Sequence, residues 1–196
     1  MAVTSERFAQ GLTYDAYKGQ MTRNRERFEA NERSVVIGAD DRAAFAGKPL
    51  KVLVLAEDWC GDVVANLPVL GRLARETGTL DLRVFLRDQN DDLMAQYLNG
   101  EFKSIPVFAF FDERFREIGR FIERPATVTE LRRKRRAEIY ASDPAFGSPD
   151  APPDALPEDV RARLAAALQK VRDDMKEFSD REVLRELRAV TARRPA

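Results

Sequence analysis

The sequence predicts an α/β fold in which a β-α-β segment is followed by a β-β-α segment. An apolar run over residues 51–56 predicts a buried strand, and residues 61–76 repeat apolar side chains at helical spacing. A second apolar run at 80–86 completes a strand-helix-strand crossover, which makes the two strands parallel. Residues 107–111 and 117–122, joined by a short polar turn, then predict an antiparallel hairpin.

Further helices are expected before, within and after these strands. Good helix formers predict one continuous helix over 14–31 and a short one over 40–46. Residues 91–98 follow the second strand and predict a linking helix, and residues 127–140 predict a helix after the hairpin. The central body therefore ends in a helix.

A proline-rich stretch separates this body from a helical tail. Its prolines are too dense for a helix or a sheet, whereas apolar residues from Val160 to Phe178 recur at three- and four-residue steps. Ser179 with Glu182 forms the pattern of a capping box that opens a second tail helix. We expect the tail to pack on the body or on a second subunit, so a homodimer through the helical extensions is one arrangement. The expected parts are an N-terminal helical extension (1–47), the α/β domain (48–140), a linker (141–157) and the tail (158–196).

Composition excludes several kinds of chemistry. The 33 Lys and Arg residues balance 33 Asp and Glu residues, and the chain has no His. Histidine-based triads and histidine-ligated zinc are therefore excluded, and the single Cys excludes an internal disulfide. The amino terminus lacks the pattern of a signal peptide, and no run approaches the roughly 20 apolar residues of a membrane helix. We expect a cytoplasmic protein that binds no membrane.

Two charged segments resemble binding sites but are interpreted as having no ligand. Residues 88–92 resemble the start of a calcium loop, but Leu93 and Asn99 replace its required Gly and Glu, so we expect no metal site. The basic run 132–136 spreads around a helix beside acidic neighbours, so we interpret it as a solvated face and expect no nucleic-acid partner. No phosphate-binding glycine motif occurs, and no cofactor is expected.

The only cysteine, Cys60, lies where the first predicted strand ends and the next helix begins. Open α/β sheets place their sites at this end of a strand. A sulfur in the first turn of a helix faces free backbone N–H groups and the positive end of the helix dipole, which stabilise a thiolate. The acidic neighbours Glu57, Asp58 and Asp62 oppose this effect, and the net sign stays open. Asp62 has a second interpretation, as a carboxylate that stabilises the helix itself.

Residues 48–140 resemble thioredoxin. The matching features are Trp59-Cys60-Gly61 after an apolar strand, Pro68 in the following helix, Asp88-Gln89-Asn90 after the second strand, and Ile105-Pro106 before the hairpin. The resemblance implies a thioredoxin-like fold in which Pro106 is cis and faces Cys60. It makes Cys60 the candidate catalytic residue. The candidate substrate-binding residues are Trp59, Gly61, Asp62, Val63, Ile105 and Pro106.

Two positions depart from the family pattern. Val63 replaces the second cysteine of the C-x-x-C motif, and Val54 replaces the buried carboxylate that the family places beneath that cysteine. If Cys60 attacks a disulfide, no neighbouring thiol can release the resulting mixed disulfide. The isolated chain therefore lacks the dithiol cycle.

Three functions stay open on this sequence. In the first, Cys60 exchanges with disulfides of proteins or low-molecular-weight thiols, and an external thiol resolves the adduct. In the second, the fold is a redox-inactive module whose groove binds peptide. The third is an iron–sulfur cluster held between subunits, as in the monothiol glutaredoxins, whose Cys-Gly-Phe-Ser motif is only half matched.

Overall fold

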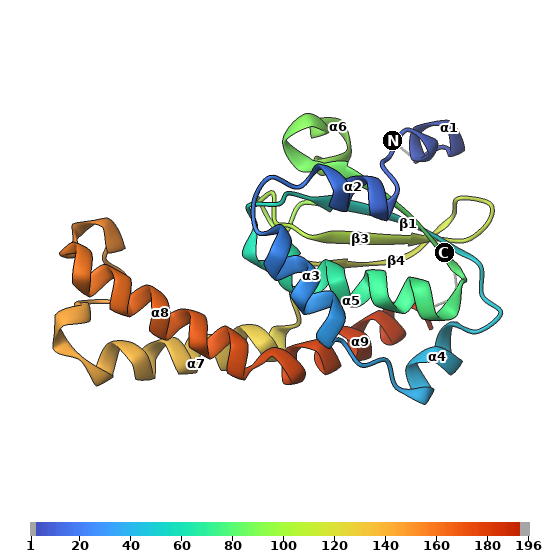
Figure 1. The fold of residues 1–196 in the computed structure, drawn as a ribbon. Coiled ribbons are helices and arrows are strands. Elements are labelled where there is room, and N and C mark those ends of the chain that lie inside the picture. Colours follow the sequence, from blue (N-terminus) through green and yellow to red (C-terminus); the bar gives the residue numbers. More distant parts are fainter. Residues whose placement is uncertain (1–2, 193–196) are drawn as a thin grey trace. The chain divides into compact units, whose positions relative to one another are not determined.

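A four-stranded sheet with the order β2-β1-β3-β4 organises the computed structural model, which describes residues 3–192 (Figure 1). The parallel pair β1–β2 and the antiparallel pairs β1–β3 and β3–β4 match the expected β-α-β and β-β-α segments, so the predicted fold class is confirmed. The strands are β1 (Leu50–Ala56), β2 (Leu80–Leu86), β3 (Val107–Phe111) and β4 (Glu117–Ile122).

Helices precede, separate and follow these strands along the chain. The α-helices are α1 (Ser5–Ala9), α2 (Tyr14–Gln20), α3 (Arg25–Ser34), α4 (Ala39–Phe45), α5 (Gly61–Thr77), α6 (Asp91–Met94), α7 (Ala126–Ser142), α8 (Glu158–Asp174) and α9 (Lys176–Thr191). Short 3-10 turns are η1 (Arg87–Gln89), η2 (Pro144–Phe146) and η3 (Pro153–Ala155). Within residues 3–192, no helix combines the length and apolar character that crossing a bilayer requires.

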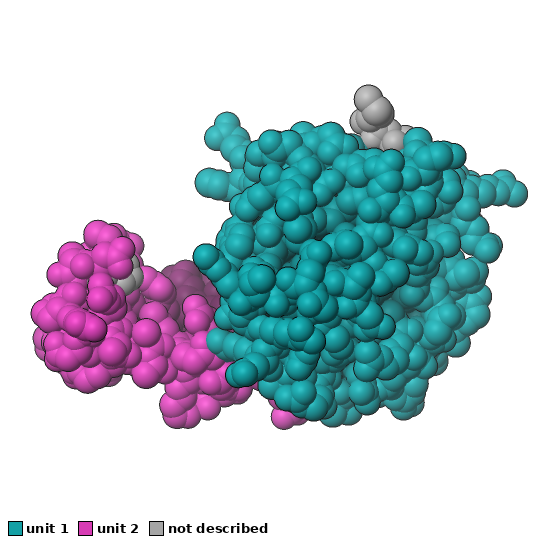
Figure 2. Space-filling model, turned by 45° about the horizontal axis from the view of Figure 1, so that its top comes forward, with its two compact units in different colours: residues 1–124, 183–196 teal, residues 125–182 magenta. Residues whose placement is uncertain are grey.

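The described chain divides into two compact units (Figure 2). The first contains residues 1–124 together with 183–196, and the second contains residues 125–182. The second unit has a small core of its own, in which Tyr140 and Phe146 pack with Val160 and Leu164. Helix α9 begins in the second unit and continues into the first.

The core of the first unit forms around β1 and β3. Every residue of β3 is buried, and in β1 only Lys51 is partly exposed, because helices and neighbouring strands cover these central strands. Helix α5 packs against α3 and contributes Leu67, Leu70 and Leu73 to the core. The carboxyl end of β1 and the start of α5 are thereby held in a fixed relation, which fixes the position of Cys60.

The predicted helix over 14–31 is wrong as one element, because the structure breaks it into α2 and α3. The backbone N–H groups of Thr22 and Arg23 donate to the carboxylate of Asp58, at 2.7 and 2.9 Å. A continuous helix would use those N–H groups internally. Asn24 then begins α3 with a left-handed backbone (φ 56°). A partner more than 30 residues away in the sequence therefore ends the helix.

Three smaller expectations also change. The predicted helix over 91–98 is only one turn long, and α1 was not expected at all. The tail breaks at Met175, which is buried, and Ser179 lies inside α9 with its N–H donating to the carbonyl of Met175. The predicted capping box at Ser179 is therefore wrong, because the N–H of Ser179 is already used in a hydrogen bond within α9.

Candidate functional site

Cys60 lies at the amino end of α5 as its N-cap residue. The side chain is partly buried, and its sulfur lies 3.6 Å from the carbonyl oxygen of Ile105, to which the thiol donates a hydrogen bond. The peptide bond between Ile105 and Pro106 is cis. The structure thus brings together the sulfur and the cis-proline loop, as the resemblance implied.

The surroundings of Cys60 favour the neutral thiol. Burial raises the pKa of Cys60, and the charge of Asp62 adds to the increase. The backbone N–H groups of Val63 and Asp62 and the guanidinium of Arg87 act in the opposite direction but do not reverse it. The hydrogen bond to Ile105 also needs the thiol proton. The sign that the sequence left open is therefore an increase in the pKa.

The three acidic neighbours have different roles. Glu57 is buried and accepts a hydrogen bond from the N–H of Asp88 at 2.9 Å, and burial raises the pKa of its carboxyl. Burial acts to raise the pKa of Asp58, but hydrogen bonds from the Arg23 and Thr22 backbone hold it below its ordinary value. Asp62 forms an ion pair with Arg124. These carboxylates thus tie the loop around Cys60 to distant segments.

Trp59 provides the exposed surface beside the sulfur. It is 42% exposed, and the guanidinium of Arg87 lies 4.8 Å from the centre of its ring. Arg87 also donates a hydrogen bond to the carbonyl of Lys103 at 3.2 Å. Arg87 therefore links the Trp59 surface to the segment that leads into the cis-proline loop.

The other predicted binding residues differ in what they expose. Gly61 is exposed, and no atom lies within 4 Å of the position that a Cβ would occupy there. Val63, Ile105 and Pro106 are buried, Val63 completely, so their side chains offer little surface to a substrate. No hydrogen bond within residues 3–192 uses the backbone N–H of Ile105.

Sequence reasoning missed three residues around the sulfur. Tyr17 is fully buried, and its hydroxyl has no hydrogen-bond partner among the described residues. Burial is the main cause that raises the pKa of Tyr17, and the charges of Asp58, Glu57 and Cys60 add to the increase. Arg87 and Arg124 are the other two. Arg124 is 62 positions from Asp62, and no local pattern in the sequence points to that pair.

Metal binding has no support in the part of the chain that the structure describes. Within residues 3–192, no group of three or more Cys, Asp or Glu side chains is arranged to hold a metal ion. The chemistry available at this site is that of one thiol, an exposed indole and the backbone of the cis-proline loop.

Comparisons with known proteins agree with this arrangement. A crystal structure of a protein of unknown function from Pseudomonas aeruginosa is 21% identical, with a TM-score of 0.62 over 89% of this chain and 99% of that one. An HIV epitope-scaffold is 20% identical, with a TM-score of 0.64 over 97% and 98% of the two chains. At this identity the likenesses show the fold alone.

The family assignment comes from a different comparison. No functionally curated protein matches the chain. The family model described as thioredoxin matches residues 11–138, which is more than half of the chain and includes Cys60 and the cis-proline loop. The chain therefore belongs to the thioredoxin family.

Proposed function

We propose that this protein performs thiol–disulfide exchange through Cys60, with an external thiol completing the reaction. One observation carries the proposal: a partly exposed sulfur at the start of α5 lies 3.6 Å from the carbonyl of the residue before a cis-proline. A structural cysteine sealed in the core would have neither the exposure nor this neighbour. The substrate class is a disulfide of a protein or of a low-molecular-weight thiol.

The thiol–disulfide exchange proceeds in two steps. The Cys60 thiolate attacks one sulfur of a substrate disulfide, forms a mixed disulfide and releases the other half as a thiolate. A second thiol then attacks the substrate sulfur of the mixed disulfide and restores the Cys60 thiolate. The second thiol comes from outside the chain, because Val63 occupies the resolving position and is fully buried. The raised pKa of Cys60 makes the first step slow at neutral pH.

The surrounding groups support binding of an extended chain. Trp59 gives an exposed flat face, and Gly61 leaves room above the helix start. The free N–H of Ile105 offers one backbone hydrogen bond to a substrate strand. A reducing compartment such as the cytoplasm suits a free thiol, and we place the protein there as part of the proposal.

The test is adduct formation with glutathione disulfide. The full chain is incubated at several pH values, and intact mass spectrometry detects a single glutathionyl group that is absent from Cys60→Ser. Added reduced glutathione should then release the group. Alkylation by iodoacetamide in parallel establishes that the sulfur is reachable. An alkylated protein that forms no adduct, even at a pH where a model thiol reacts fully, would contradict the proposal.

A redox-inactive peptide-binding module is the second candidate. It is favoured by Val54 and Val63, both fully buried where the family places an acid and a thiol, and by the raised pKa of Cys60. Binding of an extended peptide library would be followed by the fluorescence anisotropy of dye-labelled peptides, which reports binding equally in every variant. This candidate requires that Cys60→Ser binds the selected peptides as the wild type does, and that Trp59→Ala loses them. Loss of binding in Cys60→Ser would reject it.

A further inference from the structure

Exposed apolar side chains gather beside Cys60. Among residues 3–192, the large apolar side chains that are exposed are Val36, Trp59, Leu98 and Phe102. Single exposed apolar residues are common on proteins, whereas several close together mark interaction sites. Trp59 adjoins Cys60 in the sequence, and Leu98 and Phe102 belong to one turn that leads into the cis-proline loop. We call residues 98–103 the apolar turn.

Hydrogen bonds fix the backbone of the apolar turn. The backbones of Asn99 and Phe102 exchange hydrogen bonds at 2.9 and 3.1 Å, and Gly100 between them has a left-handed conformation (φ 63°). The ring of Phe102 is nevertheless 73% exposed. An aromatic side chain on a backbone that is already ordered can bind a partner at a low entropic cost.

One end of the apolar turn is linked to the indole of Trp59. The guanidinium of Arg87 lies over the Trp59 ring and also donates a hydrogen bond to the carbonyl of Lys103. Lys103 directly follows Phe102 in the sequence. The two exposed aromatic residues therefore belong to one part of the surface.

The other end of the apolar turn is linked to the first turn of α5. The side-chain amide of Asn99 donates to the carboxylate of Glu123 at 3.4 Å. Glu123 pairs with Arg124 at 2.8 Å, and Arg124 pairs with Asp62, two positions after Cys60. Both ends of the apolar turn are thus tied to residues next to the sulfur.

The apolar turn also carries a charge without a partner. Lys103 pairs with Asp91 at 2.7 Å. The carboxylate of Glu101 is exposed and forms no hydrogen bond or ion pair with any residue of 3–192. Opposite charges face each other across specific interfaces. A partner that fits this surface therefore combines an apolar side chain with a lysine or an arginine.

We infer that the substrate of Cys60 is a disulfide of a protein segment in which aromatic and basic residues adjoin the cysteine. This inference rests on the proposed thiol–disulfide exchange and specifies its substrate. Packing of the substrate ring on Trp59 and Phe102 removes apolar surface from water, and Glu101 receives the basic side chain. Glutathione has no apolar side chain for this surface, so its disulfide is the poorer substrate.

The experiment compares peptide disulfides that share one leaving group, thionitrobenzoate, on their only cysteine. The first peptide has Phe on both sides of the cysteine and Lys beyond them, the second has Ser in place of both Phe, and the third has Glu in place of Lys. Attack of the Cys60 thiolate on the peptide sulfur forms the mixed disulfide and releases the coloured thionitrobenzoate thiolate. Each rate is divided by that of N-acetylcysteine with the same peptide, which removes differences in intrinsic reactivity.

The wild type should react about tenfold faster with the Phe peptide than with the Ser peptide, which is the lower end of what burial of a Phe side chain contributes. Phe102→Ser should lose most of this preference and keep the wild-type rate with the Ser peptide. Glu101→Gln should lose the preference for Lys over Glu and keep the preference for Phe. All three peptides should be inert toward Cys60→Ser.

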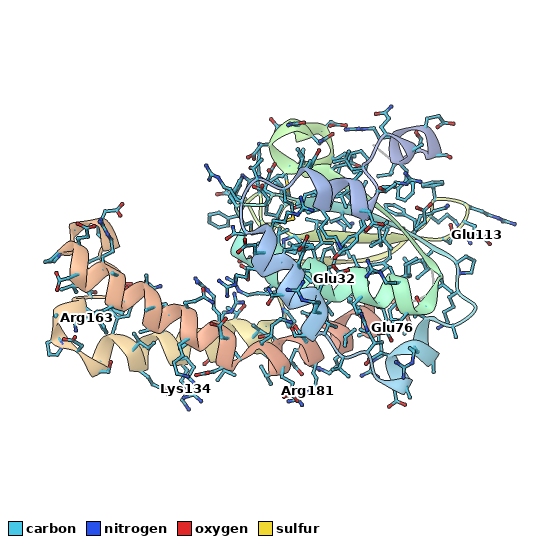
Figure 3. The ribbon with its side chains drawn as sticks, in the orientation of Figure 1. Glu32, Glu76, Glu113, Lys134, Arg163 and Arg181 are labelled. Carbon is cyan, nitrogen blue, oxygen red and sulfur yellow. The ribbon has the colours of Figure 1, made fainter. Side chains whose placement is uncertain are left out.

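Val36→Ser is the matched control, because Val36 is the exposed apolar residue away from the site. It precedes Ile37, whose carbonyl accepts from Arg42, and Arg42 pairs with Glu76 near the end of α5 (Figure 3). At a rise of 1.5 Å per residue, Glu76 is about 24 Å along the helix from Cys60. This variant should keep the wild-type preference for the Phe peptide.

Equal normalised rates of the wild type with the Phe and Ser peptides would overturn the inference. A preference that persists in Phe102→Ser, or that falls equally in Val36→Ser, would also overturn it. In each of these cases, release of thionitrobenzoate by the wild type but not by Cys60→Ser still supports the proposed function. If the wild type releases no more than Cys60→Ser from any peptide, the proposed function and this inference are both wrong.

Discussion

The thiol of Cys60 donates its hydrogen to the carbonyl of Ile105, across 3.6 Å and 45 positions of sequence. The sulfur therefore faces an acceptor, although it lies at a helix start where N–H donors are available. Loss of the proton would leave a thiolate against the carbonyl oxygen. Burial raises the pKa of the Cys60 thiol, and a carbonyl oxygen that accepts from the thiol favours the same protonated form.

Alkylation of Cys60 should be slow at neutral pH and should keep accelerating in base. A raised pKa means that the thiolate fraction at pH 7 is below that of a free cysteine, whose pKa is about 8.5. The rate with iodoacetamide is measured as a function of pH on the folded protein and on the same protein in urea. The alkylation rate of the folded protein should rise at a higher pH than that of the protein in urea. A folded profile that levels off at lower pH than the unfolded one would contradict this expectation.

Asp62→Asn should lower the pKa of Cys60 and also lower stability. The negative charge of Asp62 raises the pKa of the thiol, so its removal favours the thiolate. The same carboxylate stabilises the first turn of α5, typically by about 0.3–1 kcal/mol, and pairs with Arg124. The pH profile of alkylation and urea unfolding measure the two effects.

The matched control for Asp62 is Asp92→Asn. Asp92 also lies in the first turn of a helix and pairs with an arginine, Arg7 at 3.0 Å. It is not among the main causes of the shift in the pKa of Cys60. The alkylation profile should therefore stay unchanged in this variant. A shift of equal size in both variants would mean that the effect comes from general loss of stability rather than from local charge.

Asp58→Asn should destabilise the protein at neutral pH by about 1–2 kcal/mol, because hydrogen bonds to a charged acceptor are stronger than those to an amide. The carboxylate accepts from the backbone of Thr22 and Arg23. Its folded pKa is lowered, so this stabilisation is present above the pKa of the unfolded chain and is lost as the pH falls through the folded value. Urea unfolding at neutral and acid pH should show the difference between variant and wild type shrinking in acid.

Asp91→Asn is the control for that measurement. Asp91 is an exposed carboxylate that pairs with Lys103 at 2.7 Å, and exposed pairs contribute about 0–1 kcal/mol. The variant should unfold close to the wild type at both pH values. A loss as large as that of Asp58→Asn would show that any acidic residue of this region has the same effect.

Gly71→Ala and Gly61→Ala should have very different effects on stability, although both residues lie in α5. A Cβ at Gly71 would lie 2.2 Å from the ring of Tyr14, so the ring has to move, at a cost of about 1–3 kcal/mol. At Gly61 nothing lies within 4 Å, and alanine favours a helix by up to about 1 kcal/mol. Thermal unfolding should place Gly71→Ala below the wild type and Gly61→Ala at or above it. Equal melting temperatures would contradict the close packing of α2 on α5.

The strands and the main helix were predictable because their signals are local. The apolar runs 51–56 and 80–86 lie within β1 and β2, and 61–76 lies within α5, since burial and helical spacing leave a pattern along the chain itself. The place of Cys60 at a strand-helix junction follows from the same patterns.

The ends of helices in the extensions were less predictable, because distant residues set them. Nothing near Thr22 in the sequence indicates that Asp58 takes its N–H, and nothing near Ser179 indicates that the tail bends at Met175. Propensity describes what a segment prefers alone, and a buried contact or a hydrogen bond from elsewhere overrides it.

By itself the sequence determined the fold class, the single thiol at the head of α5 and the lack of a resolving partner at Val63. Only the tertiary structure decided the state of that thiol, because its pKa depends on burial and on Ile105 and Arg87, two groups whose distances from the sulfur are set by folding. The ion pair between Asp62 and Arg124 was likewise decided by folding, because 62 positions of sequence separate the two residues. Electrostatic energies depend on distance and on access to water, and a linear sequence contains neither.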